Sequence, residues 1–152
     1  MKKTIGLQEL IRQNKQNTRL TQKFLMKLPL GFVFVTKVTS PSMEPLLPIG
    51  CFIKVKKTTI KQTYKGDIIM FTNKNYGYPV VHRILRKIKQ NSKILLVTKG
   101  DNAQHKDSYF VEQKNFIGKV IQKLNDRGVY ESLNTPWIFL RSLIKKYLPF
   151  YQ

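Results

Sequence analysis

The chain has few of the residues that build cross-links and metal sites. Among its 152 residues there are one cysteine, Cys51, two histidines and eight acidic residues. A single cysteine excludes a disulfide within the chain and a cysteine-based zinc site. The histidines and acids match no metal-binding spacing, and no glycine-rich phosphate-binding loop is present. We therefore expect neither a metal nor a nucleotide cofactor.

Long hydrophobic runs are also missing. The most apolar stretch near the start, residues 28–35, contains Pro29 and Gly31, and it is far shorter than the roughly twenty residues that a membrane-spanning helix needs. The small-residue cleavage site of a signal peptide does not follow it. We expect a protein that is soluble or peripherally associated with a membrane, and that is cytoplasmic unless a partner anchors it.

Negative charge is scarce. Against 28 lysines and arginines stand eight acids, which gives a formal net charge of +20. Most of these basic side chains are expected to lie on solvated faces, but their summed field attracts polyanions such as nucleic acid or an anionic membrane surface. The hydrophobic fraction of 41% argues against disorder, and the length suits one domain with its own core. The oligomeric state is not indicated.

The middle of the chain has the pattern of β-strands. Short stretches rich in β-branched and aromatic residues are separated by turns that contain Gly, Asn or Asp. We predict a mainly β fold, in which an antiparallel sheet is coiled into a partial barrel. The predicted strands cover residues 32–38, 51–56, 68–72, 79–88, 93–98 and 116–124.

Helical patterns flank this region. Residues 1–30 form a basic segment whose apolar spacing predicts one or two short amphipathic helices. Residues 134–152 are predicted to form a C-terminal helix, with Thr135 as its N-cap and Pro136 at its first position. We expect that helix to pack on, or to extend, a β-rich domain of residues 31–133.

Three stretches contain residues that could act together in catalysis. They supply a hydroxyl at Ser42, an imidazole at His82 and a carboxylate at Asp101 or Asp107. A serine nucleophile needs such a base and a group that orients the base. Taken one at a time, a serine between prolines is more often a turn residue, and a strand histidine is more often structural. The residues themselves do not choose between the two aspartates.

These stretches belong to an ordered set of motifs that resembles the signal peptidase I family of serine peptidases. The closest resemblance is to its serine–histidine branch, which includes the catalytic subunit of the endoplasmic reticulum complex and archaeal and sporulating-bacterial relatives. The resemblance covers roughly residues 36–121. The motifs are SPSMEP at 40–45, KGDIIMF at 65–71, VHRI at 81–84, TKGDN at 98–102 followed by Asp107, and IGKV at 117–120.

The resemblance implies a site and an activity. Ser42 would be the nucleophile, His82 its base, and Asp107 the acid that orients His82. The activity would be that of a serine endopeptidase that cuts a leader or signal peptide after a small residue through an acyl-enzyme, without a cofactor. Its partners would be a peptide or preprotein substrate and an anionic membrane surface contacted peripherally. Residues implied to support the site are Asp101, Arg83 and Ser40, the last as a donor in the oxyanion hole.

The sequence departs from the family pattern at three points. Pro41 stands where glycine is usual, and Cys51 stands where aspartate is usual. The membrane anchor that usually precedes the serine is not found. In its length and its tail the chain resembles small soluble relatives, some of which serve peptide maturation.

Two other functions remain as alternatives. A self-cleaving repressor-type peptidase domain shares the Ser-Met-x-Pro motif, but such domains use lysine where His82 stands. A non-catalytic basic β-domain could bind nucleic acid, with Tyr76, Tyr78 and Tyr109 stacking on bases. Because no RNA-binding motif is present, we do not expect nucleic acid as a partner.

Overall fold

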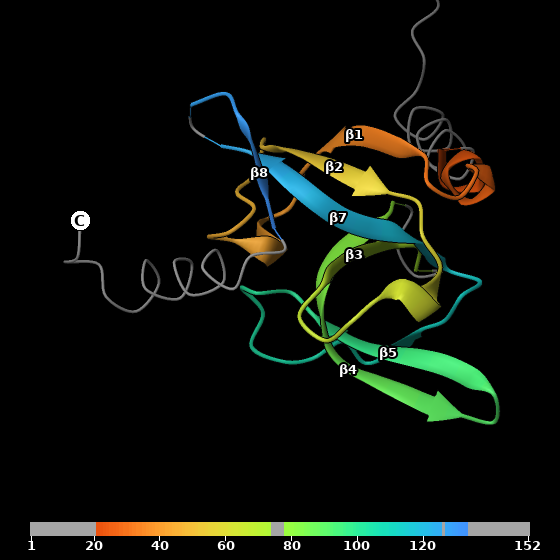
Figure 1. The fold of residues 1–152 in the computed structure, drawn as a ribbon. Coiled ribbons are helices and arrows are strands. Elements are labelled where there is room, and N and C mark those ends of the chain that lie inside the picture. Colours follow the sequence, from red (N-terminus) through yellow and green to blue (C-terminus); the bar gives the residue numbers. More distant parts are fainter. Residues whose placement is uncertain (1–20, 74–77, 126, 134–152) are drawn as a thin grey trace, which may run out of the picture.

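The computed structural model describes residues 21–73, 78–125 and 127–133 (Figure 1). Strands dominate these residues, as predicted. The strands are β1 (Val33–Lys37), β2 (Phe52–Lys56), β3 (Ile68–Phe71), β4 (Val80–Gln90), β5 (Lys93–Lys99), β6 (Phe110–Val111), β7 (Phe116–Leu124) and β8 (Tyr130–Ser132). Two short 3₁₀ helices, η1 (Pro41–Met43) and η2 (Ile60–Gln62), precede β2 and β3.

All eight strands join one antiparallel sheet. Its order is β1-β2-β7-β3-β4-β5-β6, and β8 pairs with β7. The register shifts where β2 meets β7, where β3 meets β7 and where β4 meets β5, and such irregularities increase strand twist. The sheet therefore curls, with β7 crossing its middle and the β4–β5 hairpin extending to one end (Figure 1). The predicted coiled antiparallel sheet is confirmed.

The core consists of two clusters on opposite sides of β3. Ile68 and Met70 belong to one cluster, and Ile69 and Phe71 belong to the other. This division follows the two-residue period of a strand. Met43, which is 1% exposed, lies in the first cluster. The residue next to Ser42 is thereby fixed in the core.

The predicted strands agree with the structure in number and position except at the short ones. Each of the six predicted stretches overlaps one strand, and only β4 and β5 run past the predicted ends, to residues 90 and 99. The tight turn of the β4–β5 hairpin is built on Asn91 and Ser92, both with positive φ, as two-residue hairpin turns require. Strands β6 and β8 were not predicted. They have two and three residues, which is too short for alternation to be recognised.

The flanking segments are described only in part. Residues 21–27 are helical, in line with the expected N-terminal helices, while residues 1–20 and the predicted helix of residues 134–152 lie outside the described residues. The domain boundaries at residues 30 and 133 remain predictions. Within the described ranges, no helix has the length and apolar character needed to cross a membrane.

Candidate active site

Ser42 lies in the single turn of η1. Pro41 occupies the start of this turn, where a proline ring suits helical geometry, and the Glu44 N–H closes it by donating to the Pro41 carbonyl at 3.1 Å. The Ser42 hydroxyl is 3.2 Å from the hydroxyl of Ser40, the residue at the N-cap position of the turn. The fold thus presents two neighbouring hydroxyls at this position.

His82 lies on β4 and contacts Asp107. The imidazole Nδ1 is 2.7 Å from Asp107 Oδ2, and each side chain is 12% exposed. An ionised carboxylate can only accept hydrogen bonds, so a neutral imidazole in this position carries its hydrogen on Nδ1 and has its lone pair on Nε2. The Phe71 ring meets the imidazole edge-on, with a centroid distance of 6.1 Å. This arrangement leaves Nε2 as the basic atom of the pair.

Gly100 marks the point where the serine and the histidine meet. A Cβ atom at this position would be 3.2 Å from His82 Nε2, 3.2 Å from Ser42 Cβ and 2.6 Å from the Ser42 carbonyl oxygen. The loop after β5 is also bonded to the serine turn, because the Asn102 N–H donates to Ser42 O at 2.9 Å and its amide donates to Pro41 O at 3.2 Å. Glycine at residue 100 keeps this junction open.

A cavity opens beside the junction. Its volume is about 480 Å³, and Ser40, Ser42 and His82 all line it. Apolar side chains form much of the remaining wall, among them Val38 and Met70. The candidate nucleophile and base therefore face a largely apolar space that can hold part of a ligand.

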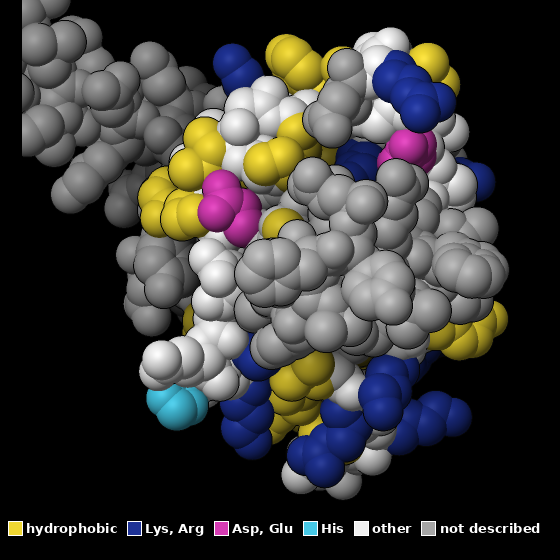
Figure 2. All heavy atoms as spheres, turned by 90° about the vertical axis from the view of Figure 1, so that its left-hand side faces the viewer, with side chains coloured by type: hydrophobic (Ala, Val, Ile, Leu, Met, Phe, Trp, Pro, Cys, Tyr) yellow, Lys and Arg dark blue, Asp and Glu magenta, His cyan; other side chains and the backbone are white. Residues whose placement is uncertain are grey.

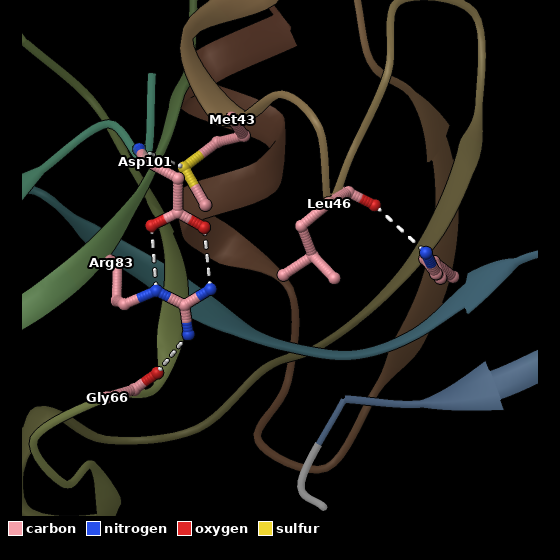
Figure 3. Close-up of polar contacts among 6 residues, drawn as sticks. Met43, Leu46, Gly66, Arg83 and Asp101 are labelled. Carbon is pink, nitrogen blue, oxygen red and sulfur yellow. Dashed lines mark hydrogen bonds and ion pairs between the residues drawn. The ribbon is translucent and has the colours of Figure 1, made fainter. Parts of the chain in front are cut away.

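Asp101 pairs with Arg83, whereas Asp107 pairs with His82. The Asp101 carboxylate accepts from Arg83 Nε at 2.8 Å and from Nη2 at 2.6 Å, and Arg83 Nη1 donates to the Gly66 carbonyl at 2.8 Å (Figure 3). The Asp101 N–H is 3.5 Å from the sulfur of Met43. Asp101 thus contacts the serine turn through Met43, and Asp107 is the aspartate that bonds to His82.

Three further residues lie at the candidate site, although the sequence analysis gave them no role. Gly100 and Asn102 contact the serine turn as described above, and Thr98 Oγ1 is 2.5 Å from Asp107 Oδ2. All three belong to the TKGDN motif. Their position in this motif was the signal by which the sequence could have identified them, but the motif does not show which atoms they contact.

Neither a metal centre nor a thiol nucleophile is indicated among the described residues. No group of three or more His, Cys, Asp or Glu side chains that could hold a metal ion occurs there. Burial raises the pKa of the Cys51 thiol, and the charge of Lys123 opposes this effect only in part. Since the thiolate is the reactive form of cysteine, Cys51 is suited to packing.

Comparisons with known proteins agree with the motifs. The model of the family described as Peptidase S24-like matches residues 3–121. The signal peptidase complex catalytic subunit SEC11 of Colletotrichum graminicola is 32% identical over 114 residues, which cover 68% of this chain and 66% of the relative. Its counterpart in Pyricularia oryzae is 34% identical over 95 residues, covering 57% and 55%.

A bacterial relative is similar over a shorter range. Signal peptidase I W of Bacillus subtilis is 40% identical over 89 residues, which cover 57% of this chain and 46% of the relative. The chain thus spans between about half and two thirds of the length of these relatives.

Proposed function

The chain belongs to the S24-like peptidase family, and from that premise we propose that it is a serine endopeptidase of the signal peptidase type. Its substrate would be a leader or signal peptide, cut after a small residue. The observation that carries the proposal is the hydrogen bond of His82 to Asp107, together with the cavity that His82 and Ser42 both line. Similarity to SEC11 subunits and to signal peptidase I W supports the substrate class.

The residues suit acyl transfer in two steps. Ser42 Oγ attacks the scissile carbonyl carbon while His82 Nε2 takes the hydroxyl proton. The imidazolium then gives this proton to the leaving amine as the C–N bond breaks, which leaves an ester on Ser42. Water, deprotonated by the same nitrogen, hydrolyses the ester and restores the serine. Asp107 holds the Nδ1–H of His82 throughout and stabilises the imidazolium.

The negative oxygen of the tetrahedral intermediate requires hydrogen-bond donors. We assign this role to the Ser42 backbone N–H and the Ser40 hydroxyl. Ser40 Oγ is 3.2 Å from the attacking oxygen, which places it within reach of a carbonyl bonded to that oxygen. Donors fixed in place before the reaction stabilise developing charge without reorganisation.

An extended peptide fits the surroundings of Ser42. Among the strands that the structure describes, β1 pairs with β2 alone, and Thr36, Lys37 and Val38 line the cavity at the end of β1. The backbone groups on the outer side of such a strand can bind a peptide as an additional strand. A substrate held in this way would run along β1 toward the cavity.

A peripheral contact with an anionic membrane is part of the proposal. Phe24, Leu30 and Phe32 are exposed by 65%, 66% and 45%, and the exposed Lys23 and Lys27 accompany them. Further positive charge lies on the β4–β5 hairpin, and Figure 2 shows Lys and Arg side chains gathered at the lower end of the molecule. Exposed apolar side chains accompanied by lysines suit an interface with anionic lipid.

The activity is tested with purified protein and peptides that carry a small-x-small site, with and without anionic vesicles. We expect cleavage by the wild type, and loss of cleavage in Ser42→Ala and His82→Ala. The exposed His105 provides a matched control, because His105→Ala should cleave as the wild type does. Cleavage that persists in Ser42→Ala would refute Ser42 as the nucleophile.

The same assay distinguishes the self-cleaving alternative. If the chain acted only on itself, its own mass would fall with time while added peptides stayed intact. Under our proposal the chain keeps its mass and the peptides are cut. Sedimentation with anionic but not with neutral vesicles tests the membrane contact separately.

A further inference from the structure

Thr98 binds the aspartate that holds the histidine. Its hydroxyl oxygen is 2.5 Å from Asp107 Oδ2, the same oxygen that lies 2.7 Å from His82 Nδ1. The backbone of the two residues is also joined, because the Asp107 N–H donates to the Thr98 carbonyl at 2.8 Å. Asp107 is therefore held by Thr98 at two points, one of them on the oxygen that contacts the imidazole.

The direction of the hydroxyl bond follows from its environment. Thr98 is 0% exposed, and a buried hydroxyl needs a partner. A carboxylate can only accept, so the Thr98 hydroxyl donates to it. The bond to an ionised acceptor is stronger than one between neutral groups.

Strand register places Thr98 beside the histidine. Thr98 on β5 is opposite Ile84 on β4, and Ile84 shares a face of β4 with His82 because side chains alternate along a strand. Asp107 follows β5 in a loop that returns to the same place. Its carboxylate consequently depends on contacts with β4 and β5 for its orientation.

We propose that Thr98 is a positioning residue for catalysis. Its hydroxyl fixes the Asp107 carboxylate so that Oδ2 stays on Nδ1–H of His82 and the imidazole presents Nε2 to Ser42. Its β-branched side chain has restricted χ1 freedom, which holds the hydroxyl in one direction. This role rests on the proposed function, but the geometry of the His82–Asp107 pair can be measured without any substrate.

The first test compares two substitutions of Thr98. Thr98→Val keeps the shape and removes the hydroxyl, whereas Thr98→Ser keeps the hydroxyl. We expect kcat to fall about tenfold or more in Thr98→Val, since small displacements of catalytic groups are costly. KM should change less than about twofold, because Thr98 does not contact the cavity. Thr98→Ser should recover most of kcat.

A second buried threonine provides the matched control. Thr63 is also 0% exposed, and its hydroxyl donates to the Ile60 carbonyl at 2.8 Å. Thr63→Val should lower the unfolding midpoint without changing kcat per folded molecule. If Thr63→Val and Thr98→Val reduced kcat equally, or if Thr98→Ser were as impaired as Thr98→Val, the positioning role would be overturned.

Proton NMR of the full chain provides a readout that needs no activity. The Nδ1–H of His82 should give a strongly downfield resonance in the wild type and in Thr98→Ser, and it should shift or broaden in Thr98→Val. If the resonance shifts in Thr98→Val but the wild type cleaves no peptide, the result supports the positioning of Asp107 by Thr98 and refutes the proposed function. An unchanged resonance in Thr98→Val would overturn the role of Thr98. If Thr98→Val does not fold, Thr98→Ala serves in its place.

Discussion

Asp101 binds the Arg83 guanidinium through both carboxylate oxygens, at 2.8 Å from Nε to Oδ1 and 2.6 Å from Nη2 to Oδ2. The two side chains are 18% and 10% exposed. Planar two-point pairs of this kind give geometric specificity as well as energy. Since Arg83 also donates to the Gly66 carbonyl, the pair joins the loop after β5 to the turn before β3. We therefore expect Asp101 to support the frame in which Asp107 and His82 meet.

The two aspartates should respond differently to the same substitution. Asp107→Asn replaces an acceptor of the His82 Nδ1–H by an amide that can impose the wrong tautomer, so we expect kcat to fall at least about a hundredfold. Asp101→Asn breaks a largely buried ion pair, and the free energy of unfolding should fall by about 3 kcal/mol. Activity per folded molecule should fall less in Asp101→Asn than in Asp107→Asn. Peptide cleavage and urea unfolding measure the two effects.

The order of the two activity losses decides the assignment. Equal losses per folded molecule, or a greater loss in Asp101→Asn, would contradict the role given to Asp107. Because each variant keeps the size of the side chain, a difference between them reflects charge and hydrogen bonding.

Gly100 should not tolerate a side chain. A Cβ there would be 2.6 Å from the Ser42 carbonyl oxygen, and a backbone atom cannot move aside without shifting the serine turn. We expect Gly100→Ala to lower kcat/KM at least about tenfold, because the distance from Ser42 to His82 would change. Steady-state kinetics of the folded fraction measure this effect.

Gly128 is the control for the glycine substitution. It has a φ of +76° and no atom within 4 Å of an added Cβ. Gly128→Ala should therefore cost about 1 kcal/mol of stability through backbone strain and leave kcat/KM unchanged. Normal activity of Gly100→Ala would show that the junction is wider than the structure has it.

The longer strands could be predicted because side chains alternate between the two faces of a sheet, and the sequence shows this alternation. Ile53 and Val55 alternate with Lys54 and Lys56, and the structure buries the first two completely. Strands β6 and β8 could not be recognised, because they form through pairing with longer strands rather than through a pattern of their own. From a single sequence, only strands long enough to show their own alternation can be predicted.

The site was predictable in its residue types and less so in its contacts. Ser42 and His82 follow from motifs, but the residues alone left Asp101 and Asp107 open, and the resemblance to a family chose between them. The bond of Thr98 to Asp107 was not foreseen. It depends on the path of the loop between these residues, which has no periodicity that would predict where it returns.

Cys51 should react slowly and should be dispensable. Burial raises the pKa of its thiol, so little thiolate is present at pH 7 to 8, and thiolate is the form that reacts with iodoacetamide. We expect alkylation of the native protein to be several times slower than that of the urea-unfolded chain. Cleavage activity should survive in Cys51→Ala. Rapid alkylation that abolished cleavage would contradict the assignment of Cys51 to packing.

Lys57 should make stability depend on pH above neutrality. The residue is 7% exposed, and burial lowers the pKa of its ammonium group from the ordinary 10.5. The unfolded chain therefore binds this proton more tightly than the folded chain does. Between the pKa of Lys57 in the folded chain and its higher pKa in the unfolded chain, the contribution of Lys57 to the free energy of unfolding rises with pH. At neutral pH, the buried charge lowers stability.

The substitution Lys57→Met isolates this component. It should raise the urea midpoint at pH 7, where the wild type still carries the buried charge, and this advantage should shrink as the pH approaches 10.5. The contact from Lys57 Nζ to the Leu25 carbonyl is long, at 3.4 Å, so its loss should not outweigh the gain. The exposed Lys89 gives the control Lys89→Met, whose difference from the wild type should stay nearly constant with pH. If the advantage of Lys57→Met grew with pH, the ammonium would be stabilised in the folded state, contrary to its burial.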